Sequence, residues 1–243
     1  MKKPVIGITC PWSVETWGST MEDGGYYYVG RPYVEAISRF GGIPVLISPE
    51  CEHTERTMNI QGYLSILDGV LFTGGGDVKR PLGAKLENLR NQQPVRYDYE
   101  KELLEAFVDA KKPVLGICRG FQMIIETFGG SLAEELVDGH KQKLPAWEPW
   151  HDVIINSQSK LYDLLKTERT GVNSFHVQQA EDLPKNFIVS AKTEDGVIEA
   201  IEFTGGQFIM GFQFHPEELV RQNGEFGKVF EMFIAEATNV NPK

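Results

Sequence analysis

The sequence contains no apolar run long enough to cross a membrane, which argues against a membrane-spanning protein. The first residues, MKKPVIGITCPWS, lack the longer apolar core of a signal peptide. Positive charge is also scarce, because 34 acidic residues outnumber 24 lysines and arginines and leave a net charge of −10. Nucleic-acid binding needs a basic surface, so neither a nucleic acid nor a membrane is expected as a partner.

Cysteine is rare, with three residues in the 243-residue chain, namely Cys10, Cys51 and Cys118. Their odd number and wide separation argue against a disulfide scaffold and favour a reduced, cytoplasmic protein. The spacings of common zinc sites, C-x-x-C and H-E-x-x-H, are absent. No metal and no organic cofactor is therefore expected.

Short apolar runs alternate with helical stretches through the first half of the chain. This pattern is typical of a parallel sheet with helices on both faces. Pro32 suits a first helical turn, Gly41 a helix end, and Asp98 an N-cap. The predicted strands cover residues 4–9, 43–48, 69–73 and 113–117, and the predicted helices cover residues 31–42, a stretch ending near Leu67, and residues 97–112.

The second half of the chain has a different pattern and predicts antiparallel additions to the parallel sheet. No internal repeat or Pro/Ser-rich linker divides the sequence, so one domain is expected over residues 1–243. Four strand-like runs lie close together and are followed by one helix; they cover residues 151–156, 186–193, 196–203 and 207–214, with the helix at 224–237.

Two segments show no clear periodicity. Residues 10–30 are rich in glycine and aromatic side chains, and a loop of this length is either a lid over a site or an aromatic loop packed on the surface. Residues 77–97 are polar and irregular. The sequence leaves the role of both segments open.

The segment LGICRGFQ places Cys118 between Gly116 and Gly120, after one predicted strand and before a helical stretch. Catalytic groups in open α/β sheets gather beyond the carboxyl ends of the strands. The glycines leave room for the sharp turn of a nucleophile elbow, and a helix N-terminus favours a thiolate. The N–H of Arg119 would then be an oxyanion donor. A buried structural cysteine is the alternative.

A cysteine nucleophile needs a base and a group that orients the base. His215 and Glu217 follow the apolar run QFIMGFQF, and the strand period of two predicts both side chains on one side. Pro216 favours an extended His215. A surface turn is the alternative for this His-Pro-Glu segment.

The run TGGGD, residues 73–77, follows the predicted strand 69–73. Consecutive glycines let the backbone approach a ligand and present N–H groups. Gly75 or Gly76 is therefore predicted as the second oxyanion donor. The phosphate-loop pattern G-x-x-x-x-G-K-[ST] is absent, and a plain turn remains the other alternative.

The segments GGGD, GICRGFQ, GGSL, VNSFHVQ and GFQFHPE occur in the order found in the class I glutamine amidotransferase-like family, and the resemblance covers nearly the whole chain. It implies a flavodoxin-like three-layer sandwich with a mostly parallel central sheet. It also implies a Cys-His-Glu triad formed by Cys118, His215 and Glu217. Arg119 and VNSFHVQ resemble the γ-glutamyl-γ-aminobutyrate hydrolase branch, a peptidase C26-like group that serves putrescine breakdown.

The resemblance implies hydrolysis of the γ-glutamyl amide bond of a small γ-glutamyl amine through a thioester, with release of glutamate. It assigns the α-amino and α-carboxylate ends of the glutamyl group to Gln122 and to the segment Asn173, Ser174, Phe175 and His176. From the residues alone, this segment is equally well a capped turn with His176 at the surface.

The chain departs from the family pattern in two places. RPLGAKLENLRNQQPVRYD replaces the usual acid-rich insert, which puts the leaving amine in doubt, and Phe214 replaces the usual Trp. Two other functions stay open: a glutaminase subunit that supplies ammonia to a partner synthase, and a non-catalytic regulatory protein on the same scaffold. The oligomeric state is also open, and a homodimer is plausible.

Overall fold

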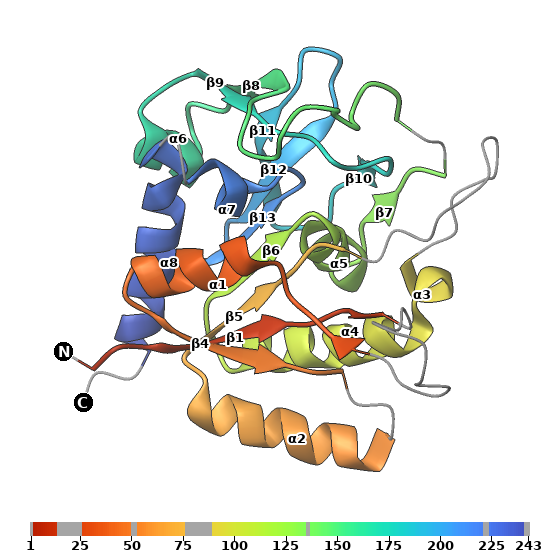
Figure 1. Cartoon of the computed structure of the whole chain (residues 1–243), viewed down its shortest axis with the longest axis vertical. Coiled ribbons are helices and arrows are strands. Elements are labelled where there is room, and N and C mark those ends of the chain that lie inside the picture. Colours follow the sequence, from red (N-terminus) through yellow and green to blue (C-terminus); the bar gives the residue numbers. More distant parts are fainter. Residues whose placement is uncertain are drawn as a thin grey trace.

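The computed structural model of the protein describes residues 2–13, 26–49, 53–75, 89–134, 137–220 and 224–240. Its centre is a nine-stranded sheet with the order β4-β1-β5-β6-β13-β12-β11-β8-β9 (Figure 1). Two further pairs of short strands lie outside this sheet; they are β2 (Trp12–Ser13) with β3 (Tyr26–Tyr27), and β7 (Ser131–Leu132) with β10 (Ala180–Asp182).

The first five strands in this order form the parallel half of the sheet, which confirms the predicted fold class. They are short and almost entirely apolar, as expected for strands covered on both faces. Their bounds are β4 (Ile43–Ile47), β1 (Val5–Thr9), β5 (Gly69–Phe72), β6 (Val114–Ile117) and β13 (Ile209–Phe212).

The remaining strands form the predicted antiparallel half, β12 (Ile198–Phe203), β11 (Phe187–Lys192), β8 (His151–Ile155) and β9 (Arg169–Val172). One strand differs from the expectation that the second half adds antiparallel strands. β13 follows β12 as an antiparallel neighbour, but its other edge pairs with β6 in parallel, with Gly211 opposite Gly116. The last strand of the chain therefore lies inside the sheet.

Helices cover both faces of the sheet and give three layers (Figure 1). Strand alternation sends Leu71 toward the core beneath α1 and α8, and sends Val70 and Phe72 toward the core beneath α2, α4 and α5. The helices are α1 (Arg31–Arg39), α2 (His53–Ile66), α3 (Leu89–Gln92), α4 (Pro94–Asp109), α5 (Arg119–Thr127), α6 (Lys160–Leu165), α7 (Pro216–Leu219) and α8 (Gly227–Asn239).

The predicted helix ends are partly confirmed. Pro32 lies in the first turn of α1, and Gly41 follows its end with a φ of 99°. The prediction that Asp98 caps the next long helix is wrong, because α4 begins at Pro94 with Gln93 at the N-cap. Proline has a fixed φ that suits a first turn, so the helix starts earlier. Asp98 Oδ1 instead lies 3.1 Å from Arg90 Nε.

The long aromatic segment begins and ends in the short β2–β3 pair, while residues 14–25 lie outside the described residues. Tyr28, which is largely exposed, brings its hydroxyl about 4.0 Å from where a Cβ on Gly75 would lie. The lid hypothesis for residues 10–30 stays a prediction. Residues 77–88, which make up most of the second irregular segment (77–97), are likewise outside the described residues. No helix in the part of the chain that the structure describes combines the length and apolarity that a membrane span requires.

Candidate active site

Three predicted chemical groups follow three adjacent parallel strands. Gly74 follows β5, Cys118 follows β6, and His215 lies just beyond β13. Parallel strands bring their carboxyl ends to one edge of a sheet, so these groups meet there. A Cβ atom on Gly74 would lie 3.1 Å from Cβ of Cys118 and 3.0 Å from Cε1 of His215. Both side chains therefore border Gly74.

Cys118 occupies a strained turn between β6 and α5. Its φ of 54° and ψ of −104° are rare for a residue that carries a side chain. The flanking glycines are required by close contacts: a Cβ on Gly116 would lie 2.5 Å from the carbonyl oxygen of Gly120. A Cβ on Gly120 would lie 2.2 Å from the carbonyl oxygen of Phe72. The Gly-x-Cys-x-Gly spacing thus fits the tight approach of α5 to two strands.

His215 and Glu217 form a short, buried pair. His215 Nδ1 lies 2.7 Å from Glu217 Oε1, and the Glu217 side chain is 2% exposed. Burial alone would lower the pKa of His215, but the charge of Glu217 and hydrogen bonds with Cys118 and Glu217 hold it well above its usual range. Because Nδ1 faces the carboxylate, Nε2 is the ring nitrogen left for the thiol.

The reason for this pairing differs from the predicted one. The strand period does not reach His215, because β13 ends at Phe212. His215 is instead the N-cap residue of α7, with φ −109° and ψ 82°, and Pro216 begins the helix. Glu217 lies in the first turn of this short helix, and the turn folds its carboxylate back onto the imidazole.

The backbone of His215 is held by Asn173, a residue predicted to contact substrate. Asn173 Oδ1 accepts from the N–H of His215 at 2.7 Å, and its Nδ2 donates to the carbonyl oxygen of His215 at 2.9 Å. Nδ2 also donates to the carbonyl oxygen of Ala146 at 2.6 Å. Phe175 meets the His215 ring edge-on, with 5.9 Å between ring centroids. Both residues therefore position the imidazole.

Tyr33 of α1 is a site residue that the sequence analysis missed. Its buried hydroxyl accepts a hydrogen bond from the N–H of Gly74 at 3.0 Å and lies 3.4 Å from His215 Nδ1. Burial, followed by the nearby charge of Glu217, raises the pKa of Tyr33 well above its usual range, so the hydroxyl stays protonated. Because the N–H of Gly74 already donates to the Tyr33 hydroxyl, it is not an oxyanion donor.

Arg96 of α4, which the sequence analysis also missed, binds the carbonyl oxygens of the glycine loop. Its guanidinium is fully buried and donates to the carbonyl oxygens of Thr73, Gly74 and Gly75 at 3.1, 3.3 and 2.8 Å. Gly75 has a φ of 87°, which favours glycine. Gly76, the other predicted oxyanion donor, lies outside the described residues. Arg96 binds the carbonyl oxygens of Thr73, Gly74 and Gly75, and among these three described residues the N–H of Gly75 is the donor left for a ligand.

Arg119 connects the elbow to the same network. Its Nη1 lies 3.0 Å from Glu100 Oε2, and Arg96 Nε lies 2.7 Å from Glu100 Oε1. Burial lowers the pKa of Arg119 to about 10, although the charge of Glu100 opposes this shift. As the first residue of α5, Arg119 has a backbone N–H without an intrahelical acceptor. An Arg–Glu–Arg triad thus joins the turn at Cys118 to the glycine loop.

The other predicted substrate contacts already have protein partners. Gln122 donates from Nε2 to Gln213 at 3.1 Å. Ser174 donates from Oγ to the carbonyl oxygen of His140 at 2.6 Å. His176 is buried, with Nε2 3.2 Å from Glu199 Oε1, in a separate cluster of histidines. Their assignment to a glutamyl group stays a prediction.

The assembled groups have the parts that acyl transfer requires. A thiol sits on a strained turn, an imidazole borders the same glycine as the thiol, and a carboxylate faces one nitrogen of that imidazole. Two backbone N–H groups, those of Gly75 and Arg119, come from the two flanking turns. This arrangement suits nucleophilic attack on a carbonyl carbon.

Comparison with known proteins supplies independent information. The sequence profile of the Peptidase C26 family matches residues 4–217. The chain is 32% identical to the "Putative glutamine amidotransferase-like protein YvdE" of Lactococcus lactis over 214 residues, covering 85% of this chain and 87% of the relative. It is 28% identical to gamma-glutamyl-gamma-aminobutyrate hydrolase of Escherichia coli O157:H7 over 246 residues, covering 96% of this chain and 93% of the relative.

The fold also matches a solved structure. A crystal structure from Thermoplasma acidophilum, titled "putative gmp synthase subunit a protein", superposes with a TM-score of 0.64. The match covers 98% of this chain and 96% of that one, at 18% identity. At this identity the likeness concerns the fold alone.

Proposed function

Since the chain belongs to the peptidase C26 family of glutamine amidotransferase-like proteins, we propose that it hydrolyses the γ-glutamyl amide bond of a small γ-glutamyl amine and releases glutamate. The observation that carries the proposal is the convergence of three side chains at one sheet edge, where Cys118 and His215 both border Gly74 and His215 Nδ1 lies 2.7 Å from Glu217 Oε1. A buried structural cysteine would need neither the strained backbone of Cys118 nor a base beside it.

In the first half of the proposed reaction, the Cys118 thiolate attacks the γ-carbonyl carbon of the substrate. A carbon–sulfur bond forms and the carbonyl electrons move to oxygen. When the tetrahedral intermediate collapses, the carbon–nitrogen bond breaks and Nε2 of the His215 imidazolium gives its proton to the departing amine. The raised pKa of His215 keeps this proton available at neutral pH.

The oxyanion of the intermediate needs donors that point at the developing charge. We assign this role to the N–H groups of Arg119 and Gly75, with Gly76 as the alternative from the sequence. The N–H of Arg119 also lies at the N-terminus of α5, whose dipole favours negative charge. Arg96 and Glu100 position both donors, because they connect the glycine loop to Arg119.

In the second half, the neutral imidazole of His215 takes a proton from water, and the resulting hydroxide attacks the thioester. The carbon–sulfur bond breaks, glutamate leaves with a γ-carboxylate, and the thiolate and imidazolium are restored. Glu217 holds the ring through Nδ1 and stabilises its charged form in both steps. The residues require no metal for this sequence of steps.

A panel of γ-glutamyl amides tests the proposal. The amine portion should include GABA, because the Escherichia coli relative is named for that amide, together with putrescine, spermidine, ethanolamine and ammonia (free glutamine). We expect glutamate release from at least one γ-glutamyl amine, with kcat/KM well above the value for glutamine. A preference for glutamine, or activity that appears only with a copurifying synthase, would contradict the proposal in favour of a glutaminase subunit.

The Glu217–His215 pair predicts a shift in pH dependence. Glu217→Gln removes the charge that most raises the pKa of His215, so this pKa should fall. Acylation needs the imidazolium, and the alkaline limb of kcat/KM should therefore move to lower pH. The measurement is a pH–rate profile for the best substrate of the panel.

Glu218→Gln is the matched control, because it removes the same charge from the next residue of α7. Its alkaline limb should stay at the wild-type position. If Glu217→Gln lowers the rate equally at every pH, without moving the limb, Glu217 does not tune the imidazole.

A further inference from the structure

A second cluster of titratable groups lies in the antiparallel half of the sheet. Three of the five histidines, His140, His151 and His176, surround Glu199 near the start of β12. Glu199 is fully buried. None of these four side chains takes part in the bond-making and bond-breaking steps proposed above, and His176 alone among them is a predicted substrate contact.

The nitrogen atoms converge on one carboxylate oxygen. Oε1 of Glu199 lies 3.1 Å from His140 Nδ1, 3.4 Å from His151 Nε2 and 3.2 Å from His176 Nε2. The ligand atoms of His140, His151 and Glu199 all lie within 4.8 Å of one another. Neighbouring ligands of a tetrahedral zinc ion with bonds of 2.0–2.1 Å are about 3.3 Å apart, so the contacts to Oε1 have the required length.

The outer hydrogen bonds fix where the ring protons lie. His176 Nδ1 is 3.0 Å from the carbonyl oxygen of Gln178, which can only accept, so Nδ1 carries a proton. His140 Nε2 is 3.4 Å from the carboxylate of Asp195, which Thr193 in turn holds by a hydrogen bond. A partner on the outer nitrogen is the usual support for a histidine that binds a metal through the other nitrogen.

The inner nitrogen atoms are therefore the ones that a metal ion would bind. His140 Nδ1 and His176 Nε2 face each other at 3.2 Å, with Glu199 Oε1 near both. Lone pairs at this distance repel unless a proton or a cation lies among them. Within the described residues, His151 Nε2 and the second oxygen of Glu199 are buried without a hydrogen-bond partner. Such unsatisfied groups are rare in folded proteins and call for a ligand.

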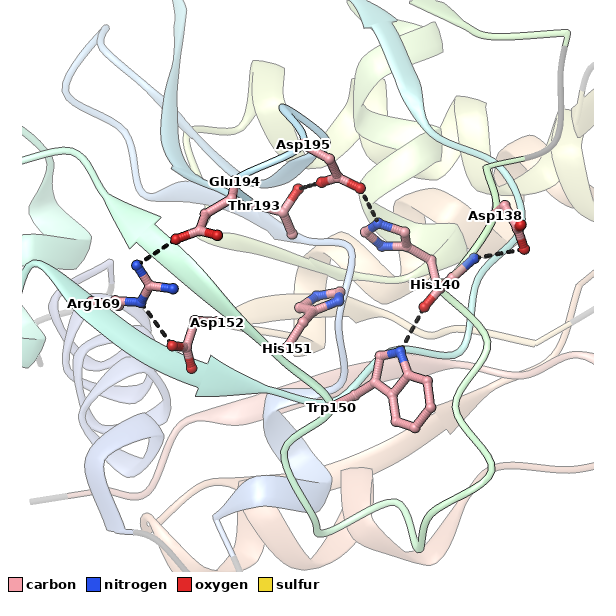
Figure 2. Close-up of a pocket in the computed structure, with 10 residues that line it drawn as sticks. Asp138, His140, Trp150, His151, Asp152, Arg169, Thr193, Glu194 and Asp195 are labelled. Atoms are coloured by element: carbon pink, nitrogen blue, oxygen red, sulfur yellow. Dashed lines mark hydrogen bonds and ion pairs between the residues drawn. The ribbon is translucent and has the colours of Figure 1, made fainter.

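A pocket of about 290 Å³ gives access to this cluster. His140 and His151 point into it, and the ring of His140 reaches toward Asp195 (Figure 2). Four of the other described residues that line the pocket are acidic, namely Asp138, Asp152, Glu194 and Asp195. Arg169 is the one arginine or lysine among these lining residues. Arg169 is bound by Asp152 and Glu194, both at 2.7 Å, which leaves an acidic entrance that favours a cation.

We propose that His140, His151 and Glu199 bind a divalent transition-metal ion, with zinc as the ion of best fit, and that His176 is the nitrogen available for a fourth bond. Imidazole and carboxylate ligands suit zinc and its first-row neighbours rather than calcium or magnesium. The ligands come from the segment before β8, from β8 itself, from the segment after β9, and from β12. The ion would tie these four parts of the chain together.

The site lies next to contacts that position His215. The carbonyl oxygen of His140 accepts from Ser174, whose neighbour Asn173 holds the backbone of His215. The ion is therefore expected to stabilise the fold around the catalytic histidine rather than to enter the chemistry. Its binding does not depend on the proposed hydrolysis.

Zinc binding is tested on the tag-free, full-length protein. The protein is treated with a chelator, desalted, incubated with zinc and desalted again, and bound metal is measured by mass spectrometry. We expect about one zinc per chain and a higher Tm with zinc than without it. Cobalt in the same site should give the visible absorption of a four-coordinate ion. A wild-type protein that retains no zinc would show that the cluster holds protons only and would overturn the proposal.

Three variants distinguish specific zinc binding at this cluster from nonspecific binding of zinc elsewhere on the protein. His151→Ala should abolish stoichiometric zinc binding and the Tm increase. Because the His151 side chain is partly exposed, its removal should leave the core intact. Asp195→Asn should weaken zinc binding by about 10–100-fold, as expected for a residue that supports a ligand. Asp163→Asn, which changes an exposed carboxylate of α6 outside this pocket, is the matched control and should bind zinc as the wild type does. Equal zinc binding by His151→Ala and the wild type would overturn the proposal.

Discussion

Replacing Cys118 with alanine is expected to reduce γ-glutamyl hydrolysis by about 10⁴-fold or more, because the nucleophile and its base act as a unit. The fold should persist, since the change removes one buried sulfur atom. Cys10→Ala is the matched control, because Cys10 is also a buried free cysteine. Its turnover should stay within a few-fold of wild type. A Cys118→Ala protein that retains wild-type kcat/KM would exclude the thioester mechanism.

The strained backbone of Cys118 gives this prediction a second part that does not depend on activity. Glycine tolerates a φ of 54° and a ψ of −104° much better than alanine does. Cys118→Gly should therefore be more stable than Cys118→Ala by about 1–2 kcal/mol, although both are inactive. Ordinarily, replacing alanine by glycine lowers stability. Thermal unfolding of the two variants compares them directly, and a less stable glycine variant would show that the turn carries no strain.

Replacing Arg96 with alanine should have the largest effect on stability. The change leaves Glu100 buried with one cation instead of two and frees the carbonyl oxygens of the glycine loop. Loss of one partner from a buried ion pair costs about 3–5 kcal/mol. Turnover should fall by about 100-fold, since the loop then no longer holds its oxyanion donor in place. Denaturant unfolding and steady-state kinetics measure the two effects.

The exposed pair of Arg31 and Glu35 provides a control with the same i, i+4 spacing as Arg96 and Glu100. Because the Arg31 side chain is 82% exposed, Arg31→Ala should change stability by less than about 0.5 kcal/mol. Arg96→Lys distinguishes charge from geometry, because lysine keeps the positive charge but lacks the planar fork. It should fold and still lose activity. Wild-type activity in Arg96→Lys would mean that the loop does not depend on the guanidinium.

The sequence predicted those features that depend on one residue type in a short segment, such as apolar residues in a buried strand or glycines in a tight turn. Apolar runs of strand length, separated by helical spacing, predicted the parallel half of the sheet, and the structure confirms it. The glycines around Cys118 predicted a crowded turn, and the structure explains them, because a Cβ on Gly116 or Gly120 would lie only 2.5 or 2.2 Å from a backbone oxygen. In both cases the information lies within a few neighbouring residues.

Contacts between distant residues could not be predicted in this way. Tyr33 looks like an ordinary helix residue, and Arg96 lies in a segment predicted to be irregular; only the packing of α1 and α4 brings them to the glycine loop. The three histidines and Glu199 are together spread over 60 positions of sequence, from 140 to 199, and no metal spacing connects them. The sequence assigned His176 to substrate because its neighbours resemble a family motif. The fold places its ring against Glu199, a residue 23 positions further along the chain.

The position of β13 affects how the protein is made. β13 occupies residues 209–212 yet lies between β6 and β12, so β6 has an unpaired apolar edge until most of the chain has left the ribosome. Such an edge can recruit other strands, and a newly synthesised chain is exposed to aggregation at this stage. The arrival of β13 closes the gap and delivers His215 to Cys118 in the same event. In the mechanism proposed above, the thiol of Cys118 would therefore acquire its base only when the sheet is complete.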